Sequence, residues 1–425
     1  MEKNNSILKN VLAKVNPPNE ELELIEKFLK NFISKLKAKL KSNAEVFVGG
    51  SFAKKTLIKK GQYDIDVFVR FNENFRGENI SNPTEKAIKS LKNIGKISRI
   101  HGSRDYFKIN VSPLFFVEVI PVIKVKNPKD AENITDLSYF HVGYIKNKLK
   151  TEKILEEVRL AKAFCHAVNC YGAESYIQGF SGYAIELLIY HYGGFFNFVK
   201  AISKIKNKEI IDIEKLYKNK NEIEMNLNSA KRTSPIILID PTYKERNALA
   251  ALSKETFEKF QNSCKKFLKN PSEKFFENEK INLEKMRDNA KKNNFEFILL
   301  EAGTNKQEGD IAGSKLIKFY RHLGDEIEKF FEIKDNGFEY NRKKEARYFF
   351  VVKKRNEIII SGPNSDDKKN SEIFRKKHKD TFTKNGRIYA KEKMKKNLKE
   401  FIEAWKLKNK EKIKDMGIIR LEIKN

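Results

Sequence analysis

The sequence contains few of the features that mark secreted, disulfide-bonded or membrane-spanning proteins. Its 425 residues include three cysteines, Cys165, Cys170 and Cys264, which are too few for a disulfide framework and lack the paired spacing of a zinc site. No apolar run approaches the roughly 20 residues that cross a bilayer, and the N-terminus lacks the apolar stretch of a signal peptide. We therefore predict a soluble protein of the cytoplasm with no membrane partner.

Acidic residues are also scarce, with 57 Asp and Glu against 86 Lys and Arg, so the formal net charge is +29. Such an excess attracts polyanions, most often phosphate backbones; the alternative is a lysine-rich composition that only solvates the surface. The excess is uneven, because residues 341–425 carry 27 Lys and Arg against 12 Asp and Glu. Basic residues there alternate with aromatic and apolar ones, as around Phe374 and Tyr389, which favours a folded basic face.

The sequence does hold enough apolar residues for several cores, with 40% hydrophobic residues, 32 Phe and 15 Tyr among them. At roughly 150 residues per domain the length suggests three domains. Apolar residues at helical spacing predict a helix over 19–40, capped by Asn19. Alternating residues predict strands over 44–48, 63–69, 107–111 and 115–120. Residues 1–145 are therefore expected to form a small mixed sheet with helices packed on it.

The rest of the chain changes pattern twice. Residues 146–275 are mainly helical by periodicity, with a short strand before Asp240. Residues 276–425 alternate again, and we expect a strand at 295–300, a helix at 310–331 and a hairpin formed by 347–352 and 357–360. This series predicts a ferredoxin-like α+β domain followed by a basic helical tail, so the fold class is α+β.

Three parts of the first domain carry residues suited to chemistry. Gly50 and Ser51 lie at the expected strand-to-helix turn, where glycine lets a phosphate approach the backbone. Asp64 and Asp66 are two apart on a strand, so both carboxylates project from one face. Glu118 is a lone carboxylate in an otherwise apolar strand. Three converging carboxylates repel one another unless a cation lies between them, and Mg²⁺ takes oxygen ligands of this kind.

Each of these signals has an ordinary alternative when taken alone. An Asp-x-Asp pair also occurs at solvated strand edges, and a Glu in an apolar strand is often ion-paired or peripheral. Their order is more specific: a Gly-Ser turn, about 12 residues to the Asp-x-Asp strand, and about 50 more to the strand with one carboxylate. That order resembles the nucleotidyltransferase superfamily of the DNA polymerase beta and poly(A) polymerase type.

The resemblance narrows to the archaeal (class I) CCA-adding enzymes over residues 45–275. The stretches that carry it are GSFAKKT (50–56), DIDVF (64–68), VEVIP (117–121), DLSYFH (136–141), EVRLAK (157–162), YGAE (171–174), GFSGY (179–183), DP (240–241) and ERNA (245–248). A looser match continues through 362–363 to 385–387. The resemblance implies a polymerase-beta-like head at 1–145, a helical nucleotide- and substrate-binding domain at 146–275, and a tRNA-binding body and tail at 276–425.

The resemblance also implies roles for individual residues. The catalytic and metal-binding carboxylates would be Asp64, Asp66 and Glu118. The nucleotide would be bound by Gly50, Ser51, Lys54, Ser138, His141, Lys162, Tyr171 and Arg246, with Ser51 and Lys54 at the triphosphate and Arg246 at the base edge. The family often has Arg, Asp and Thr where Lys54, Glu118 and Ser138 stand, and each replacement keeps the charge or the hydroxyl.

Several of these residues also have purely structural readings. His141 could be an ordinary half-buried histidine, Tyr171 could simply end a helix, and Lys162 could lie on a solvated helix face. The GFSGY stretch at 179–183 is expected to serve tight packing, and we assign it no chemistry.

The function that this implies is template-independent addition of C, C and A to tRNA 3′ ends. CTP and ATP would be the substrates, pyrophosphate would leave, and two Mg²⁺ ions would act, one on all three carboxylates and one on Asp64 and Asp66. A homodimer is one of the assemblies left open. The alternatives are another polymerase-beta-like transferase, such as a poly(A) polymerase or an oligoadenylate synthase, and an RNA-binding protein whose transferase domain is inactive.

Overall fold

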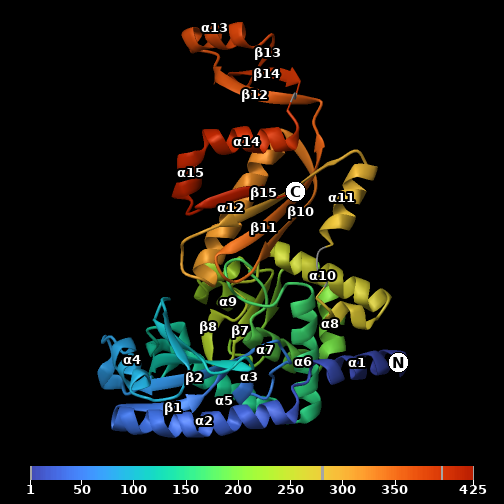
Figure 1. The fold of residues 1–425 in the computed structure, drawn as a ribbon. Helices are drawn as coiled ribbons and strands as arrows, with labels where there is room; N and C mark the ends of the chain where they lie inside the picture. Colours follow the sequence, from blue (N-terminus) through green and yellow to red (C-terminus); the bar gives the residue numbers. More distant parts are fainter. Residues whose placement is uncertain (1, 279–281, 394–395, 425) are drawn as a thin grey trace. The chain divides into compact units, whose positions relative to one another are not determined.

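The computed structural model describes residues 2–278, 282–393 and 396–424. The chain forms two compact units, Met1–Glu279 and Lys280–Asn425 (Figure 1). Helices and strands alternate in both units, so the fold is α+β as predicted. None of the helices in the described part of the chain combines the length and the apolar composition that crossing a membrane needs.

A five-stranded sheet forms the first part of the N-terminal unit. Its strands are β1 (Ala44–Val48), β2 (Tyr63–Phe71), β3 (Lys96–Ile100), β4 (Tyr106–Asn110) and β5 (Phe115–Ile123), in the spatial order β1-β2-β5-β4-β3. The two central strands, β2 and β5, run parallel, and every other neighbouring pair is antiparallel. The sequence predicted β1, β2, β4 and β5, whereas β3 was missed because its polar and apolar residues alternate only briefly.

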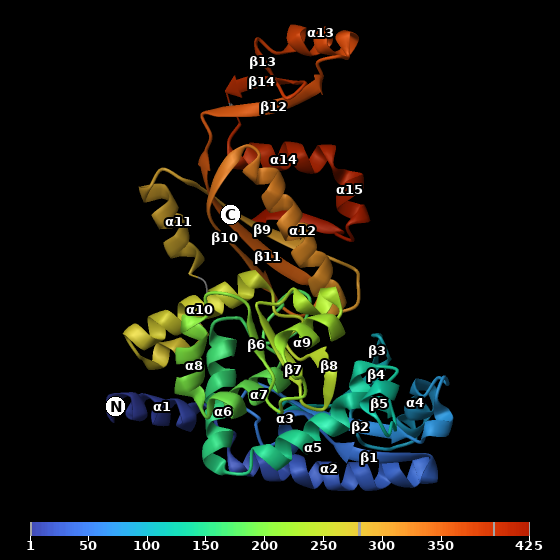
Figure 2. The same cartoon turned by 180° about the vertical axis from the view of Figure 1, so that it is seen from behind.

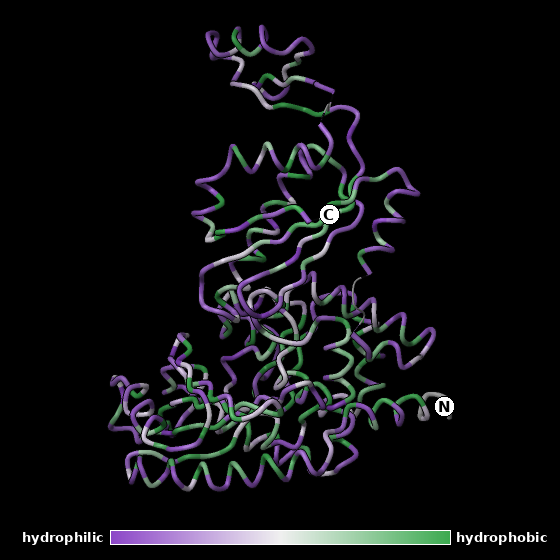
Figure 3. Tube along the Cα trace, in the orientation of Figure 1, coloured by the Kyte–Doolittle hydropathy of each residue, from purple (hydrophilic) through white to green (hydrophobic). Residues whose placement is uncertain are grey.

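Two helices cover one face of this sheet. They are α2 (Asn19–Leu40) and α4 (Ser81–Lys89), and α2 lies along β1 in both Figure 1 and Figure 2. Hydrophobic and hydrophilic residues alternate along α2 (Figure 3), and the hydrophobic ones pack on buried strand residues such as Ile65 and Val119. The cap assigned to Asn19 is wrong, since Asn19 begins the helix and Pro18 precedes it without a side-chain cap. The face opposite the helices carries the polar residues of β2 and β5.

The second part of the N-terminal unit is a helical core. It contains α5 (Ser138–Lys148), α6 (Glu152–Ala167), α7 (Gly182–Tyr192), α8 (Phe195–Lys204) and α10 (Lys254–Lys269). The first helix, α1 (Glu2–Val15), adds Val11 to this core rather than to that of the sheet. Three short strands, β6 (Glu209–Ile211), β7 (Ile236–Asp240) and β8 (Tyr243–Asn247), form a small sheet beside α9 (Lys220–Asn226). Only β7 was predicted.

The C-terminal unit contains a four-stranded antiparallel sheet with the strand order β10-β11-β9-β15. Along the chain its elements are β9 (Glu296–Gly303), α12 (Asp310–Glu328), β10 (Phe331–Tyr340), β11 (Glu345–Lys354), α14 (Leu398–Lys408), α15 (Lys410–Asp415) and β15 (Arg420–Lys424). Helices α12 and α14 share one core with the sheet. This βαββαβ order with its two helices on one face is ferredoxin-like, as predicted.

An insertion separates β11 from α14. It consists of β12 (Glu357–Asn364), α13 (Lys368–Lys377), β13 (Asp380–Lys384) and β14 (Arg387–Lys393), and its strands form a separate sheet in the order β12-β14-β13. The hairpin predicted from 347–352 and 357–360 is therefore wrong, because β11 pairs with β10 and β9 while β12 pairs with β14. The basic tail contains the expected helices and, in addition, these strands and β15.

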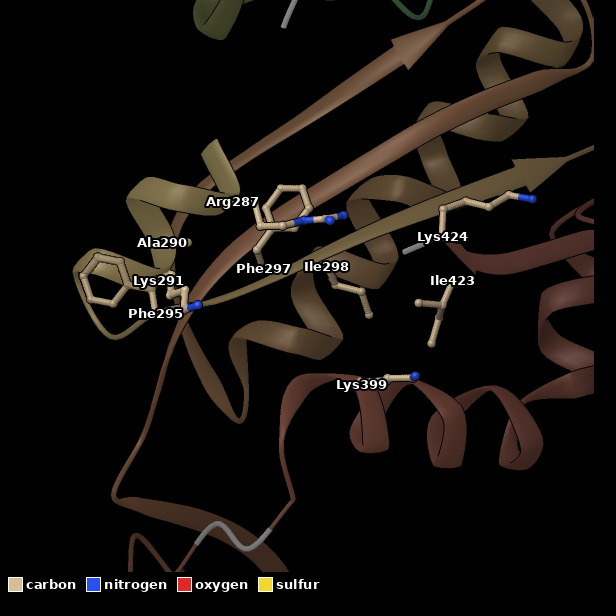
Figure 4. Close-up of a pocket in the computed structure, with 9 residues that line it drawn as sticks. All are labelled: Arg287, Ala290, Lys291, Phe295, Phe297, Ile298, Lys399, Ile423 and Lys424. Atoms are coloured by element: carbon tan, nitrogen blue, oxygen red, sulfur yellow. The ribbon is translucent and has the colours of Figure 1, made fainter. Parts of the chain in front are cut away.

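A cavity of about 370 Å³ opens at one edge of the ferredoxin-like sheet, between β9, β15, α14 and α11 (Leu283–Lys292) (Figure 4). Four of the side chains that line it are basic: Arg287, Lys291, Lys399 and Lys424. The Arg287 guanidinium lies 5.5 Å from the centre of the Phe297 ring, which also lines the cavity. The cavity thus combines positive charge with aromatic surface.

Candidate active site

The uncovered face of the five-stranded sheet carries three carboxylates on its two central strands. Asp64 and Asp66 alternate with the fully buried Ile65 on β2, so both point away from the helix-covered face. In the parallel register of β2 and β5, Glu118 lies directly opposite Asp66. The structure therefore brings Asp66 and Glu118 side by side, with Asp64 two residues along the same face.

Burial and mutual repulsion make these carboxylates costly to ionise. Burial, followed by the charges of Asp66 and Asp64, raises the pKa of Glu118 to about 8. Burial and the neighbouring Asp64 likewise raise the pKa of Asp66 to about 6, although the positive charges of Lys54, Lys60 and Lys162 oppose the shift. Each would ionise more easily if a cation lay between them.

Gly50 shapes the space beside Asp66. It begins the short helix α3 (Gly50–Ala53) with a φ of +58°, a backbone conformation that favours glycine. A Cβ atom on Gly50 would lie 1.7 Å from Oδ2 of Asp66, so the carboxylate rests directly against the glycine backbone. Ser51 follows in α3 and is half-buried, and its backbone carbonyl accepts a hydrogen bond from the Thr56 amide.

The donor set suits a hard divalent cation, because it consists of carboxylate oxygens from two adjacent strands. The side chains are not gathered around a point, however. Lys60 Nζ binds Oδ1 of Asp64 at 3.0 Å, and no three acidic, histidine or cysteine side chains in the described ranges converge as closely as a metal site requires. A bound cation would therefore have to draw the three carboxylates together, because the pairing of β2 and β5 only places them on one face.

Two of the expected nucleotide-binding lysines meet at a buried glutamate. Glu186 on α7 is fully buried, and its Oε2 lies 2.6 Å from Nζ of Lys54 while its Oε1 lies 2.8 Å from Nζ of Lys162. The Thr56 hydroxyl donates to the same Oε1 at 2.6 Å and accepts from Lys162 at 2.8 Å. Lys162 is 2% exposed, so it does not lie on a solvated helix face.

The charges in this cluster stabilise one another. Burial alone would raise the pKa of Glu186, but the attraction of Lys162 and Lys54 outweighs it and lowers that pKa to about 2. Burial lowers the pKa of Lys162 to about 8, with Glu186 opposing the shift. Glu186 and Lys162 are therefore both charged at neutral pH.

A second buried carboxylate, Asp240 at the end of β7, organises His141 and Arg246. Its Oδ2 lies 3.0 Å from Nε2 of His141 and 2.7 Å from an Arg246 guanidinium nitrogen. Its Oδ1 accepts from the Tyr183 hydroxyl at 2.9 Å and from both the amide and the hydroxyl of Thr242 at 2.8 Å. Desolvation of the Asp240 carboxylate is outweighed by these donors and charges, which hold its pKa well below the usual range.

Tyr183 connects the two clusters. Its ring stacks on His141 with centroids 4.1 Å apart, and Nζ of Lys54 lies 6.0 Å from the ring centre. The interpretation of 179–183 as tight packing without chemistry is therefore incomplete. It describes Gly179, whose Cβ would lie 2.1 Å from the Cys170 carbonyl oxygen, but it overlooks Tyr183.

Two other predicted residues have simpler surroundings. Ser138 begins α5 and is half-buried. Tyr171 follows α6, forms an isolated bridge with Phe180, and stacks on His166 with ring centroids 3.9 Å apart. A Cβ on Gly182 would lie 2.7 Å from the Tyr171 hydroxyl, which fixes the ring against the start of α7.

Sequence reasoning assigned no role to Glu186, Asp240, Thr56 or Tyr183. Glu186 did carry a signal, since it is the single acidic residue in the apolar helix over 182–192. The argument that singled out Glu118 in its apolar strand applies equally to Glu186. Two partners of Asp240, His141 and Tyr183, come from distant parts of the sequence, whereas Thr242 and Arg246 lie within six residues of it.

Comparison with known families matches most of the N-terminal unit. Residues 29–136 match a family model described as a nucleotidyltransferase domain, and residues 156–277 match one described as the second domain of tRNA nucleotidyltransferases. The two matches cover, respectively, the sheet with its carboxylates and the helical core with Glu186 and Asp240.

Curated relatives match a larger share of the chain. The CCA-adding enzyme of Methanocaldococcus jannaschii is 30% identical over 399 residues, covering 90% of this chain and 86% of that enzyme. The CCA-adding enzyme of Nanoarchaeum equitans is 42% identical over 241 residues, covering 57% of this chain and 59% of that enzyme. That of Methanosarcina acetivorans is 33% identical over 285 residues, covering 65% of this chain and 60% of that enzyme.

Among solved structures, a cytoplasmic RNA terminal U-transferase aligns with a TM-score of 0.52 at 12% identity, covering 66% of this chain and all of that one. At that identity the likeness concerns the fold alone. The assignment of the five-stranded sheet to the nucleotidyltransferase fold rests on the family model that matches residues 29–136.

Proposed function

This chain belongs to the family of archaeal CCA-adding enzymes, and we propose that it adds C, C and A to the 3′ end of tRNA from CTP and ATP, releasing pyrophosphate. The observation that carries the proposal is the placement of Asp66 opposite Glu118, with Asp64 on the same sheet face. We also propose that the enzyme acts in the cytoplasm.

Asp64, Asp66 and Glu118 act as the catalytic carboxylates. They hold Mg²⁺, which when bound supplies charge neutralisation for the triphosphate and lowers the pKa of the attacking 3′-hydroxyl. The raised pKa values of Asp66 and Glu118 support this role, because a bound cation would offset both the burial and the mutual repulsion that raise them. Gly50 leaves room for the Asp66 carboxylate at the backbone of α3.

The two buried clusters bind the two ends of the nucleotide. Lys54 and Lys162, held by Glu186, lie on the phosphate side, because their charges act on Asp66. Ser51 in α3 donates its hydroxyl to the triphosphate. His141 and Arg246, held by Asp240, lie on the base side, where the guanidinium hydrogen-bonds the base edge.

The remaining two predicted residues line the nucleotide between these ends. Ser138, half-buried at the start of α5, donates its hydroxyl to the ribose. The Tyr171 ring, fixed by His166 and by the start of α7, packs against the sugar. Both residues belong to the helical part of the N-terminal unit, which carries the second-domain match.

The C-terminal unit binds the tRNA. Its support is the excess of basic residues over 341–425 and the cavity lined by Arg287, Lys291, Lys399 and Lys424 (Figure 4). Positive charge beside Phe297 suits a nucleic-acid backbone whose bases can stack.

Salt dependence tests this assignment. Each phosphate contact contributes a log–log salt slope of about −0.7 to −0.9. Replacing Arg375, Lys376 and Lys377 of α13 by Gln should flatten the slope, whereas the same change at the exposed Lys35, Lys37 and Lys39 of α2 should not. Equal slopes for the two triple variants would show that these residues of the insertion do not contact tRNA phosphates.

Nucleotide addition to a tRNA that lacks its 3′-terminal CCA tests the activity. CTP alone should extend that tRNA by two cytidines and stop, and CTP with ATP should complete the CCA end. Continued addition from ATP alone would instead indicate a poly(A) polymerase, and no addition under any condition would indicate an RNA-binding protein. A tRNA that already ends in CCA is the matched negative control.

A further inference from the structure

Glu186 is placed differently from the other carboxylates of the active site. It lies in the middle of α7, is 0% exposed, and contacts no sheet carboxylate. Its oxygens receive hydrogen bonds from Lys54, Lys162 and Thr56, at 2.6 to 2.8 Å. The two lysines come from different parts of the unit, Lys54 from the end of α3 and Lys162 from α6. Glu186 is therefore the point that fixes both ammonium groups in one place.

The charge of this cluster does not balance. Two ammonium groups meet one carboxylate, and over the described residues no other acid lies within ion-pairing distance of Lys54 or Lys162. One positive charge remains, and it acts on Asp66, whose pKa both lysines lower. A buried, uncompensated charge is costly unless a mobile anion neutralises it. The polyphosphate of a nucleotide is the anion that the neighbouring site would supply.

We propose that Glu186 is the positioning residue of the triphosphate subsite, which aims Lys54 and Lys162 together and limits the subsite to one net positive charge. The inference rests on the proposed function and adds a role for a residue that contacts no substrate. Aiming the lysines aligns the triphosphate for attack. Limiting the charge lets pyrophosphate leave, because two unpaired ammonium groups would hold it more tightly.

Glu186→Gln separates these two effects from simple loss of structure. The amide keeps the size of the side chain but removes the charge that orients both lysines. We expect kcat for CTP addition to fall roughly 10- to 100-fold. Pyrophosphate should meanwhile bind at least about threefold more tightly, because the subsite gains a positive charge. Binding is measured directly, by calorimetric titration of the full-length protein with pyrophosphate at about pH 6, which is below the pKa of about 8 that burial gives Lys162.

Glu157→Gln is the matched control. Glu157 is a half-buried carboxylate on the adjacent helix α6, where it accepts a hydrogen bond from the Phe195 amide at 2.7 Å and contacts neither lysine. This variant should lower thermal stability without changing pyrophosphate affinity. If it tightens pyrophosphate binding as much as Glu186→Gln does, the effect is structural and the proposal fails.

A double variant keeps the proposal testable if Glu186→Gln does not fold. Lys54→Met with Glu186→Gln removes one charge of each sign, so one positive charge remains and pyrophosphate affinity should return to the wild-type value while turnover stays low. Unchanged pyrophosphate affinity in folded Glu186→Gln, or tightened affinity in the double variant, would overturn the inference. These titrations need no tRNA, so they stand apart from the CCA-addition assay, whose failure would overturn the proposed function instead.

Discussion

The carboxylates of the N-terminal unit fall into two groups that the fold treats in opposite ways. On the sheet, burial and like charge raise the pKa of Glu118 to about 8 and that of Asp66 to about 6. In the helical core, two lysines outweigh burial and lower the pKa of Glu186 to about 2. The lysines around Glu186 outweigh its burial, whereas the lysines near Asp66 and Glu118, including Lys60 paired with Asp64, do not.

This difference indicates which group does chemistry and which supports it. A site that must bind and release a cation keeps its acids close to one another, at a cost in stability. A carboxylate that only holds other side chains can be sealed inside the protein with its partners. Substitutions in the two groups should therefore have opposite effects on stability, although both should lower activity.

The largest expected effect is on turnover. Asp66→Asn or Asp64→Asn should reduce nucleotide addition by at least roughly a thousandfold, because an amide cannot replace a metal-binding carboxylate. Affinity for tRNA should stay unchanged or rise. Single-turnover extension of a truncated tRNA measures the first quantity and filter binding the second. The exposed Asp288→Asn on α11 is the control, and near-normal turnover of Asp66→Asn would remove Asp66 from the site.

Glu118→Asp is a gentler probe of the same group. It shortens the side chain by one methylene but keeps the charge, and it restores the residue that the resemblance leads us to expect here. Substantial activity should remain in the extension assay. Complete loss would mean that the pocket depends on the longer side chain.

The next largest effect concerns the space beside Asp66. Gly50→Ala should lower turnover by about 100-fold, because its Cβ would lie 1.7 Å from Asp66 Oδ2 and its φ is +58°. Gly61→Ala is the matched control, since a Cβ there meets no atom within 4 Å. Extension assays on both variants test the point, and equal activity of the two would show that the carboxylate can move aside freely.

A smaller effect is expected at Asp240, and it concerns choice of substrate. Asp240→Asn should reduce the preference for CTP over UTP about tenfold, because Arg246 and His141 lose the charge that orients them. Tyr183→Phe removes one donor to Asp240 and should change the preference by less than about threefold. Competition between the two nucleotides in one reaction measures the ratio. A larger change in this preference in Tyr183→Phe than in Asp240→Asn would show that the tyrosine, rather than the aspartate, orients Arg246 and His141.

The smallest effect is on stability, and its sign differs between the two groups. A carboxyl whose pKa folding raises binds its proton more tightly in the folded state, so the metal-free protein should lose stability as pH rises from about 4.5 to about 8. Glu118→Gln should therefore raise Tm by a few degrees at about pH 8 in the presence of a chelator. Glu186 contributes stability above its ordinary pKa, so Glu186→Gln should lower Tm. Shifts of the same sign in both variants would contradict the comparison.

The sheet site was predictable because its pattern is local. Asp64 and Asp66 share one strand, so strand periodicity places both on one face, and Glu118 stands out because its strand is otherwise apolar. The parallel pairing that sets Glu118 against Asp66 is a tertiary fact, which only the fold resemblance suggested. The buried clusters were less predictable, since Glu186 and Asp240 are defined by partners more than 20 residues away in most cases.

The C-terminal unit shows a further limit of sequence reasoning. Strand periodicity located β11 and β12 correctly but predicted that they pair as a hairpin. A short polar loop between two alternating runs is the usual sign of a hairpin. In the structure β11 belongs to the ferredoxin-like sheet, whereas β12 belongs to the separate sheet of the insertion. The strand β15, which pairs with β9 at the edge of the first sheet, lies more than 60 residues after β11, so no local pattern links it to that sheet.

The insertion between β11 and α14 lies in a connection of the ferredoxin-like domain, so removing it interrupts no strand or helix of that domain. It leaves the ferredoxin-like domain after Lys354 and the chain resumes at Leu398, while Phe401, Trp405 and Leu421 beyond it complete the domain's core. Truncating the chain anywhere inside the insertion would remove α14 and β15 from that core. Replacing the insertion by a short turn would leave every strand of the ferredoxin-like sheet in place. The insertion can therefore differ in sequence and length between relatives while the ferredoxin-like domain keeps its fold.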